Sequence, residues 1–459
     1  MQLITPDHPD YDRARRVRNA RADRRPAAIA RCASPEDVQE ALAHARRHRL
    51  PVAVRGGGAN VAGWGTCDGG VVFDLSTMKR VTVDPDARAA EAEPGLLWGE
   101  LDAATQRHGL ALPGPRNPEV GIAGHTLGGG VGDLSRQYGL TSDNVLFFDL
   151  VTADGRRVRA SADEHPELFW GLRGGGGNFG VVVRFGFRLH PVSGVVAGPL
   201  VHPAEHAPSV LRTARDWLAT APDQASLVIL IWTAPPLPFV PEHLHFERSV
   251  VLIPTWFGDP ARADEVLGPL RYGTPMPLAD AVRPMAYTAY QRLLPSPPDH
   301  TRQHVYNRGE LLADLSDATI DDLLARWASG GPNLSIVLGA LGGAIGRAPA
   351  GPTAYTHRDA RWFAEICAQW YGEPDSPAHL RPARDGWRAL QPVALGPYAN
   401  LLPDPEPEWV RAVYGPAAHE RLVRLKTVWD PDNVFRFNAN IRPLTTRTVL
   451  PRPEEATHR

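Results

Sequence analysis

The stretch Val54-Arg55-Gly56-Gly57-Gly58-Ala59-Asn60 decides the fold, because an apolar strand signal at residues 51–55 runs straight into three glycines. Without a Cβ atom, each glycine lets the backbone approach a ligand closely and adopt a positive φ. Successive N–H groups can then converge on an anion. A strand that ends in such a loop indicates a site for a diphosphate, although one glycine run alone is also typical of a tight turn.

Two further glycine runs strengthen this interpretation. Gly128-Gly129-Gly130, with Gly132, follows directly on the segment 121–127, and Gly174 to Gly180 precedes a strand signal at residues 181–187. Three runs, each beside a strand or helix signal, favour one extended ligand. Neither the G-x-G-x-x-G spacing with a following acidic residue nor a G-x-x-x-x-G-K-[ST] loop is present, so a Rossmann domain and a P-loop are both unsupported.

Length and charge set the outer limits. The 459 residues, 43% of them hydrophobic, are enough for two cores, and we expect two domains. Lys and Arg total 49 against 51 Asp and Glu, a net charge of −2, which argues against nucleic acid or an anionic membrane as partner. A small molecule is the expected partner, with a homodimer left open.

Cysteine usage and the N-terminus suggest a compartment. Cys32, Cys67 and Cys367 are too scattered for a disulfide framework or a metal site, and they suit a reducing environment. Residues 1–12 have no apolar signal region, and no segment approaches the ~18 uninterrupted apolar residues of a membrane span. We therefore expect a cytoplasmic protein without a metal.

Periodicity gives a coarse map of the chain. A helix is expected after the N-cap Ser34, followed by short strands and one helix over residues 97–108, a pattern typical of α+β. From about residue 196, strand signals alternate with helices, which we place at 260–267, 319–328 and 356–370. We expect an N-terminal domain at 1–195, a substrate-facing α/β domain at 196–425, and a segment at 426–459 that returns to the first domain.

The motifs, taken in order, resemble one family. Residues 54–60, 68–76, 121–130, 138–144 and 167–174 resemble the FAD domain of berberine bridge enzyme-like oxidases, and Trp429-Asp430-Pro431-Asp432-Asn433-Val434-Phe435-Arg436 resembles their closing motif. The resemblance implies an α+β fold: a two-subdomain FAD-binding domain of the vanillyl-alcohol oxidase type plus an α/β substrate domain with an antiparallel sheet. It also implies hydride transfer from a small organic substrate, for which we expect a secondary metabolite, to FAD that oxygen reoxidises.

The chain departs from the family where the flavin is usually attached. The pattern R-G-G-G-H-N reads Arg55 to Asn60 with Ala59 in place of histidine, and C-P-x-V-G reads Asn117 to Gly121 with Asn117 in place of cysteine. Alanine cannot form the bond, and an asparagine amide is not a nucleophile. The sequence therefore predicts FAD that is bound without covalent attachment.

The resemblance also indicates the residues of the site. His125 is expected beside the flavin with no proton transfer assigned, and Val120 at the path of oxygen, although packing could equally explain each. The expected cofactor-binding residues are Arg55, Gly56, Gly57, Gly58, Ala59, Asn60, Asn117, Val120, Gly121, Gly124, His125, Gly128, Gly129, Gly130, Gly132, Asn144, Gly177, Asn178, Gly180, Val181, Asn438 and Asn440.

Tyr398-Ala399-Asn400 matches a Y-x-N motif of the family's substrate domain, and Tyr398 and Asn400 are the predicted catalytic residues. Alternation in a strand would put both on one face, with Tyr398 as the base. A tyrosine with its usual pKa near 10 needs a cationic or hydrogen-bonded setting for that role.

Two other functions stay open from the sequence. The missing anchor is also compatible with a redox-silent enzyme of the same fold that catalyses a cyclisation or an elimination, with FAD structural or lost. A binding protein with an empty flavin groove is a third hypothesis, against which the three glycine loops argue. Fold analogy does not by itself establish a reaction.

Overall fold

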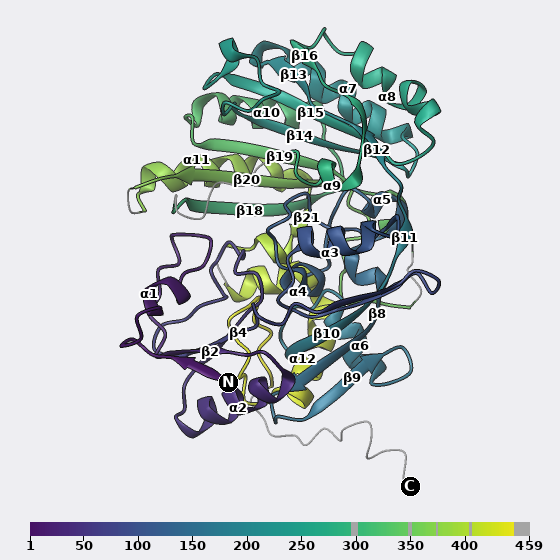
Figure 1. The fold of residues 1–459 in the computed structure, drawn as a ribbon. Coiled ribbons are helices and arrows are strands. Elements are labelled where there is room, and N and C mark those ends of the chain that lie inside the picture. Colours follow the sequence, from purple (N-terminus) through teal and green to yellow (C-terminus); the bar gives the residue numbers. More distant parts are fainter. Residues whose placement is uncertain (295–301, 348–350, 373–374, 404–405, 445–459) are drawn as a thin grey trace.

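The computed structural model describes residues 1–294, 302–347, 351–372, 375–403 and 406–444, and two lobes are stacked one above the other in Figure 1. The lower lobe contains the N-terminal strands and the long C-terminal helix. The upper lobe contains a broad sheet and its covering helices. The expected α+β architecture, with a second domain built on an antiparallel sheet, is confirmed.

A small sheet in the lower lobe carries the first glycine loop. It consists, in spatial order, of β1 (Gln2–Ile4), β2 (Ala28–Arg31), β4 (Val71–Asp74) and β3 (Val52–Arg55), and both β2 and β3 run parallel to β4. The helix α2 (Pro35–Arg47) packs its apolar side chains against this sheet. Its first turn is capped by Ser34, whose hydroxyl accepts the Asp37 N–H at 3.3 Å, as the sequence predicts.

The second subdomain of the lower lobe is an antiparallel sheet. Its strands are β5 (Val81–Asp84), β6 (Ala89–Ala92), β10 (Gly180–Arg188), β8 (Val145–Thr152) and β9 (Arg157–Ser161). Phe148 and Phe185 meet edge to face across β8 and β10, with centroids 5.6 Å apart. The helices α3 (Trp98–Gln106) and α6 (Pro166–Leu172) contribute to the same core. The third glycine run, residues 174–180, connects α6 to β10.

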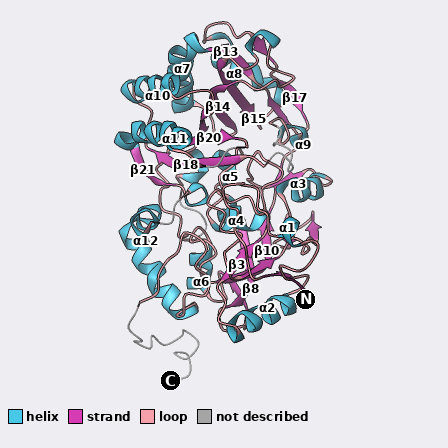
Figure 2. Cartoon of the chain, turned by 90° about the vertical axis from the view of Figure 1, so that its left-hand side faces the viewer, coloured by secondary structure: helices cyan, strands magenta, loops and turns pink. Residues whose placement is uncertain are grey.

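The upper lobe is a single antiparallel sheet covered on one face. Helices α7 (Ala207–Thr220), α8 (Ala263–Tyr272), α10 (Asp317–Ser329) and α11 (Pro377–Leu390) share a hydrophobic core with that face. In Figure 2, α7, α10 and α11 lie along one side of this sheet. The sheet consists of β16 (Ala279–Asp280), β13 (Leu200–Pro203), β15 (Arg248–Trp256), β14 (Ala225–Thr233), β19 (Leu334–Ala340), β20 (Trp362–Trp370), β18 (His304–Leu312) and β21 (Ala394–Pro397), with β12 (Val195–Ala197) and β17 (Arg283–Met285) beside β15.

Two local predictions are wrong. The helix expected over residues 356–370 is β20, whose alternate residues Trp362, Ala364 and Ile366 join the core under the helices. Apolar residues at every second position from 362 to 370 form one buried face of a strand, whereas Phe363, Glu365 and Gln369 on the other face are less buried. The strand expected through Tyr398 and Asn400 ends at Pro397, and residues 399–401 form a 3-10 turn.

The C-terminal helix α12 (Pro407–Trp429) belongs to the lower lobe by its packing. Val413, Tyr414 and Leu422 lie in the same core as the second subdomain, and the helix bends at Gly415, where φ is +67°. We therefore propose that the return to the first domain begins at α12, earlier than residue 426. Residues 445–459 of the expected C-terminal segment lie outside the described residues.

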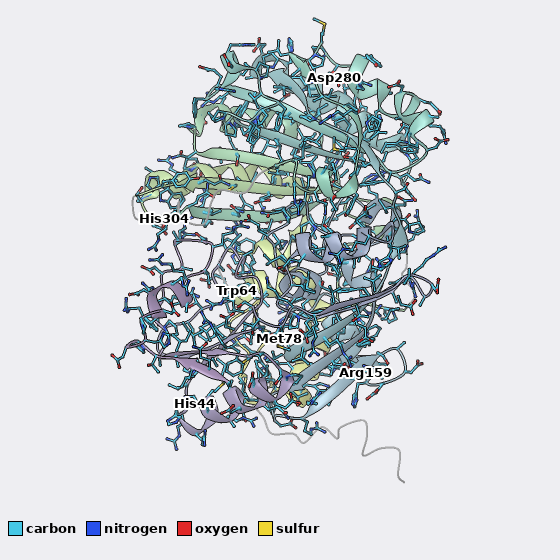
Figure 3. All side chains as sticks on the ribbon, in the orientation of Figure 1. His44, Trp64, Met78, Arg159, Asp280 and His304 are labelled. Atoms are coloured by element: carbon cyan, nitrogen blue, oxygen red, sulfur yellow. The ribbon has the colours of Figure 1, made fainter. Side chains whose placement is uncertain are left out.

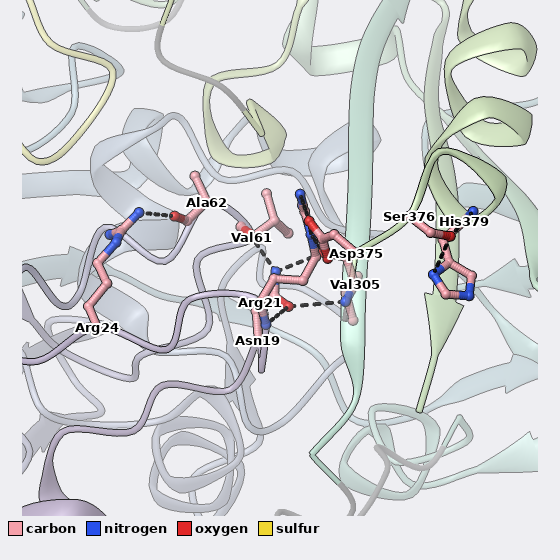
Figure 4. Close-up of polar contacts among 9 residues, drawn as sticks. All are labelled: Asn19, Arg21, Arg24, Val61, Ala62, Val305, Asp375, Ser376 and His379. Atoms are coloured by element: carbon pink, nitrogen blue, oxygen red, sulfur yellow. Dashed lines mark hydrogen bonds and ion pairs between the residues drawn. The ribbon is translucent and has the colours of Figure 1, made fainter. Parts of the chain in front are cut away.

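Buried polar side chains join the lobes. The Asn19 amide donates to the carbonyl oxygens of Val61, at 2.6 Å, and Val305, at 2.8 Å, and its oxygen accepts the Val305 N–H at 3.0 Å (Figure 4). Arg136 donates from the lower lobe to the carbonyl oxygens of Ala225 and Leu341 in the upper. The first glycine loop is thus tied to β18. Within the described residues, no helix is long and apolar enough to cross a membrane.

Candidate cofactor and active site

The first and second glycine loops pack against each other without space for side chains. A Cβ on Gly57 would lie 2.5 Å from the Gly121 nitrogen, and a Cβ on Gly121 would lie 2.5 Å from the Gly57 nitrogen. Gly56 is similarly confined, because a Cβ on it would lie 2.9 Å from the Pro94 oxygen, and Gly58 has a φ of +65°. Both loops therefore require glycine for the fold of the cradle itself.

Two polar side chains of the first loop hold its shape. Arg55 donates to Asp74 at 3.0 Å, and both side chains are less than a tenth exposed. The Asn60 oxygen accepts the N–H groups of Ala62 and Trp64 at 3.0 and 3.3 Å. Arg55 and Asn60, predicted to bind the cofactor, thus position the loop backbone. Ala59, between them, is partly buried.

The segment after Gly121 is a short helix, α4 (Ile122–Leu127), that leads into the second glycine run. Gly129 and Gly130 have φ values of +107° and +82°, which side chains rarely adopt. A Cβ on Gly128 would overlap the Asn400 side chain, and one on Gly132 would overlap the Gly114 carbonyl. Gly124, in contrast, is exposed and has open space where its Cβ would lie.

The His125 side chain is buried and supports the second glycine loop, so it is not an exposed base. Its Nε2 lies 3.1 Å from the Val131 carbonyl oxygen, which can only accept, so we assign the proton to Nε2. The ring meets Trp98 edge to face at 5.3 Å. Burial lowers the pKa of His125 to about 4, so the ring is neutral at physiological pH.

The other predicted residues of the second loop also have local roles. The Asn117 oxygen accepts the Glu119 N–H at 3.0 Å, and the partly buried Val120 packs at the edge of the lower core. Asn144 is buried and donates to the carbonyl oxygens of Tyr138 and Leu140. Its own oxygen lies 2.6 Å from His190 Nε2. Asn117 and Asn144 thus form hydrogen bonds within the protein that hold the local backbone.

The third glycine run is joined to the C-terminal segment. Asn178, fully buried, donates to the carbonyl oxygens of Gly175 and Ala439 and accepts the Ile441 N–H at 3.0 Å. Gly177 accepts from the Asn438 amide at 3.2 Å and has open space where a Cβ would be. Gly180 and Val181 begin β10, where Val181 lies in the core.

A buried ion pair, missed from the sequence, secures the same junction. Lys426 Nζ donates to Asp430 at 2.7 Å and to the carbonyl oxygens of Asn178 and Phe435 at 2.7 and 2.9 Å. Both charged side chains are fully buried. The chain has only two lysines, Lys79 and Lys426, and this one sits where three acceptors converge. The scarcity of lysine is the feature of the sequence that could have drawn attention to Lys426.

The predicted catalytic pair lies on the second glycine loop. The Tyr398 hydroxyl oxygen accepts the Asn400 amide at 2.9 Å and the Val131 N–H at 3.2 Å. Asn400 also donates to the His125 carbonyl at 3.0 Å. Burial raises the pKa of Tyr398, and the donated hydrogen bonds oppose that rise only in part. The structure brings the pair together, but through a turn instead of a strand.

Glu365 is a further candidate that the sequence reading missed. It lies on the face of β20 away from the helices and pairs with Gly309 of β18, whose carbonyl accepts the Tyr398 N–H at 2.9 Å. Glu365, on β20, and Tyr398, just after β21, thus lie on the two sides of Gly309. Burial raises the pKa of Glu365 to about 7. An acid among apolar residues is the signal in the sequence, but the helix predicted over residues 356–370 does not identify the face on which Glu365 lies.

The residues present fit FAD. The side-chain oxygens of Asn438 and Asn440 are buried, with no partner among the described residues, and can accept from flavin or ribityl donors. A cavity of about 360 Å³ opens beside them, below the substrate sheet, where Figure 3 labels Trp64. It is lined by Arg24, Ala62, Trp64, Pro403, Arg436, Phe437 and Asn440. Within the described ranges, no three His, Cys, Asp or Glu side chains are grouped to hold a metal.

Interlocked glycine loops below an antiparallel sheet, with a buried acid on one strand and a phenol in the turn that follows another, are the features of a two-domain FAD-linked oxidoreductase. The profile of the FAD binding domain matches residues 26–161, and that of the berberine and berberine-like domain matches residues 397–442. The chain belongs to the berberine bridge enzyme-like family of FAD-linked oxidoreductases, and its cofactor is FAD.

Full-length relatives support this assignment. An uncharacterised FAD-linked oxidoreductase of Bacillus subtilis is 31% identical over 96% of this chain and 97% of its own length. The (R)-6-hydroxynicotine oxidase of Paenarthrobacter nicotinovorans is also 31% identical, over 96% of each chain. The crystal structure of 6-hydroxy-D-nicotine oxidase from Arthrobacter nicotinovorans, 29% identical, superimposes with a TM-score of 0.87 over 96% of this chain and 98% of that one.

Proposed function

We propose that this chain is an oxidase that holds FAD without a covalent bond and oxidises a small organic substrate, a secondary metabolite in our reading of the sequence. The observation that carries the proposal is the residue pair Ala59 and Asn117 at the two positions where the family resemblance expects a link. Neither side chain can form one. Retention of FAD then depends on the glycine cradle and on the acceptors Asn438 and Asn440.

When bound, FAD supplies the two-electron acceptor, and we propose oxygen as the final oxidant. The chain's own residues manage the proton that the substrate loses. Glu365 suits that role at neutral pH because its pKa of about 7 lets it alternate between its two forms. Tyr398 has a pKa raised above its usual value, so we assign it and Asn400 to orienting the substrate over the second loop.

Hydrogen bonds join the glycine loops of the lower lobe to the upper lobe at two places. Asn19 ties Val61 of the first loop to β18, and Asn400 ties the turn after β21 to α4, so both edges of the site are hydrogen-bonded across the lobes. Such bracing holds reacting groups at fixed separations, which is a large part of catalysis by positioning. Val120 remains our candidate for the wall on the oxygen path.

The test is anaerobic titration of the FAD-loaded protein with candidate substrates, followed by admission of air. Bleaching of the flavin by a substrate, with recovery of colour and production of hydrogen peroxide in air, is the expected result. Conversion of a substrate with the flavin spectrum unchanged would instead favour the redox-silent cyclase or lyase. A folded protein that takes up no FAD would contradict both.

A further inference from the structure

The N-terminal segment 16–24, here called the clasp segment, runs along the first glycine loop. The Arg16 carbonyl oxygen accepts from the Arg55 guanidinium at 3.2 Å, and the Arg18 N–H donates to the Gly58 carbonyl oxygen at 3.1 Å. The clasp segment therefore contacts the loop at both the start and the end of its glycine run. Neither contact uses an N–H group of that run, so both leave those donors to a ligand.

The clasp segment also holds the chain that follows the glycine run. Arg24 donates to the carbonyl oxygens of Gly63 at 2.7 Å, Thr66 at 2.9 Å and Ala62 at 3.2 Å, and Figure 4 shows the contact with Ala62. A Cβ on Gly63 would lie 2.1 Å from the Ala22 Cβ. The two stretches of chain are thus in close contact along their length.

The middle of the clasp segment is fixed to the upper lobe. Asn19 exchanges two hydrogen bonds with the backbone of Val305 in β18. Arg21 forms a bidentate ion pair with Asp375, with N···O distances of 2.7 to 3.0 Å (Figure 4). The segment therefore cannot move away from the first loop without breaking contacts with the upper lobe.

One side chain of the clasp segment reaches the second loop. The Arg18 guanidinium forms an ion pair with Glu119, and the two side chains are 27% and 47% exposed. Glu119 lies two residues before Gly121, whose backbone packs against Gly57, and its N–H donates to the Asn117 oxygen. Arg18 thus contacts the first loop through its backbone and the second loop through its side chain.

This ion pair lies beside the two positions, Ala59 and Asn117, at which the proposed function leaves FAD without a link. Ala59 follows the carbonyl that accepts from Arg18, and Asn117 accepts from Glu119. A flavin held by the loops alone is released when the loops separate, and a contact that joins them opposes that separation. One partly exposed ion pair adds little free energy, so we expect an effect on rates before an effect on affinity.

We propose that Arg18 and Glu119 close a clasp between the first two glycine loops, and that this clasp limits the rate at which noncovalent FAD enters and leaves. The proposal rests on the noncovalent binding proposed above and names the residues that control it. A contact that forms with and without the ligand does not favour the bound state, so its loss should speed release and uptake by similar factors. Loss of a residue that binds FAD directly would instead lower the affinity.

The experiment measures FAD exchange in the full-length protein. Release is followed after dilution of the FAD-loaded protein, with phosphodiesterase present to cleave each released FAD to the more fluorescent FMN, and uptake is followed by mixing the apoprotein with FAD. Arg18→Gln and Glu119→Gln are each expected to speed both processes about threefold or more, with a smaller change in Kd. The double variant should match the single ones, because the same contact is lost in all three.

The two single variants also separate a clasp from simple charge attraction. FAD is anionic, so charge alone would make Arg18→Gln slow its uptake and Glu119→Gln speed it, whereas a clasp predicts faster uptake in both. Salt should speed exchange in the wild type more than in the double variant. The matched control is Arg212→Gln, which breaks an ion pair with Asp321 between α7 and α10, with side chains 30% and 60% exposed, and should leave exchange unchanged.

The clasp is overturned if either variant exchanges FAD at the wild-type rate, if the two variants change uptake in opposite directions, or if affinity falls while uptake does not become faster. Each of these results leaves noncovalent binding of FAD intact. Flavin that stays with the acid-denatured chain would reject noncovalent binding itself, and the clasp with it. Urea unfolding of the apoproteins shows whether a variant has altered the fold, and Glu119→Gln and Arg18→Gln test the clasp independently of each other.

Discussion

Gly57 and Gly121 lie back to back, so that a Cβ on either would stand 2.5 Å from the other's backbone nitrogen. This contact joins the loop that ends β3 to the start of α4. The cradle therefore does not depend on an anchored ligand for its shape. The close backbone contact between Gly57 and Gly121 fixes the position of both loops.

Alanine at Gly57 should damage this cradle, whereas alanine at Gly124 should act only on the ligand. Gly57→Ala forces backbone apart and is expected to lower the free energy of unfolding by about 3 kcal/mol. Gly124→Ala meets open space in the helix α4, so the apo stability should be unchanged or slightly higher. Chemical denaturation without and with FAD separates the effects. Equal losses in both variants would contradict the packing argument.

Tyr398→Phe should cost stability as well as turnover. The change removes the acceptor for both the Asn400 amide and the Val131 N–H, and an unsatisfied buried donor costs about 1–3 kcal/mol. Tyr306→Phe is the matched control, because the buried Tyr306 hydroxyl has no partner within the described ranges. Thermal unfolding and steady-state kinetics check both. If the two variants are equally stable, the hydrogen bonds of Tyr398 carry no net energy.

The two lysines offer a matched pair. Lys426→Met leaves Asp430 buried without its cation and is expected to cost about 3–5 kcal/mol and to weaken FAD binding through the third loop. Lys79→Met breaks an exposed pair with Glu100 and should cost less than about 1 kcal/mol. Urea denaturation gives both values. A small loss at Lys426 would show that the buried pair is dispensable.

The buried acid Asp102 should make stability depend on pH. Burial raises the pKa of Asp102 to about 7, and one of its oxygens has no partner among the described residues. The folded state therefore favours the protonated acid, so this contribution to stability is fully present below the unfolded-state pKa of about 4 and is lost progressively as pH rises through about 7. Asp102→Asn should raise the melting temperature at pH 8 and change it little at about pH 4. The same effect at both pH values would contradict titration of Asp102.

Local signals in the sequence predict the glycine loops well, because strand, glycine run and helix follow one another within a few residues. Ser34 as a cap and the antiparallel substrate sheet are likewise confirmed. The face of β20 could not be read in the same way. Its run of apolar residues, interrupted by Glu365 and Gln369, is compatible with a helix or a strand until the neighbours β18 and β19 are known.

Long-range contacts also explain what was missed at the site. Glu365 acquires its environment from Gly309 and Val337, far away in the sequence, and Lys426 from Asn178. Tyr398 and Asn400 were predicted from a motif, yet the turn that brings them together is fixed by contacts with α4. Several residues that were predicted to bind the cofactor, Arg55 and Asn144 among them, form hydrogen bonds to other groups of the protein. Sequence patterns located the loops better than the direction of each side chain.

The central claim, FAD held without a covalent bond, is tested most directly by acid precipitation of the purified yellow protein. We expect the flavin absorbance to appear wholly in the supernatant, since Ala59 and Asn117 cannot link it. Flavin that stays in the washed, denatured pellet and migrates with the chain on a denaturing gel would contradict the claim.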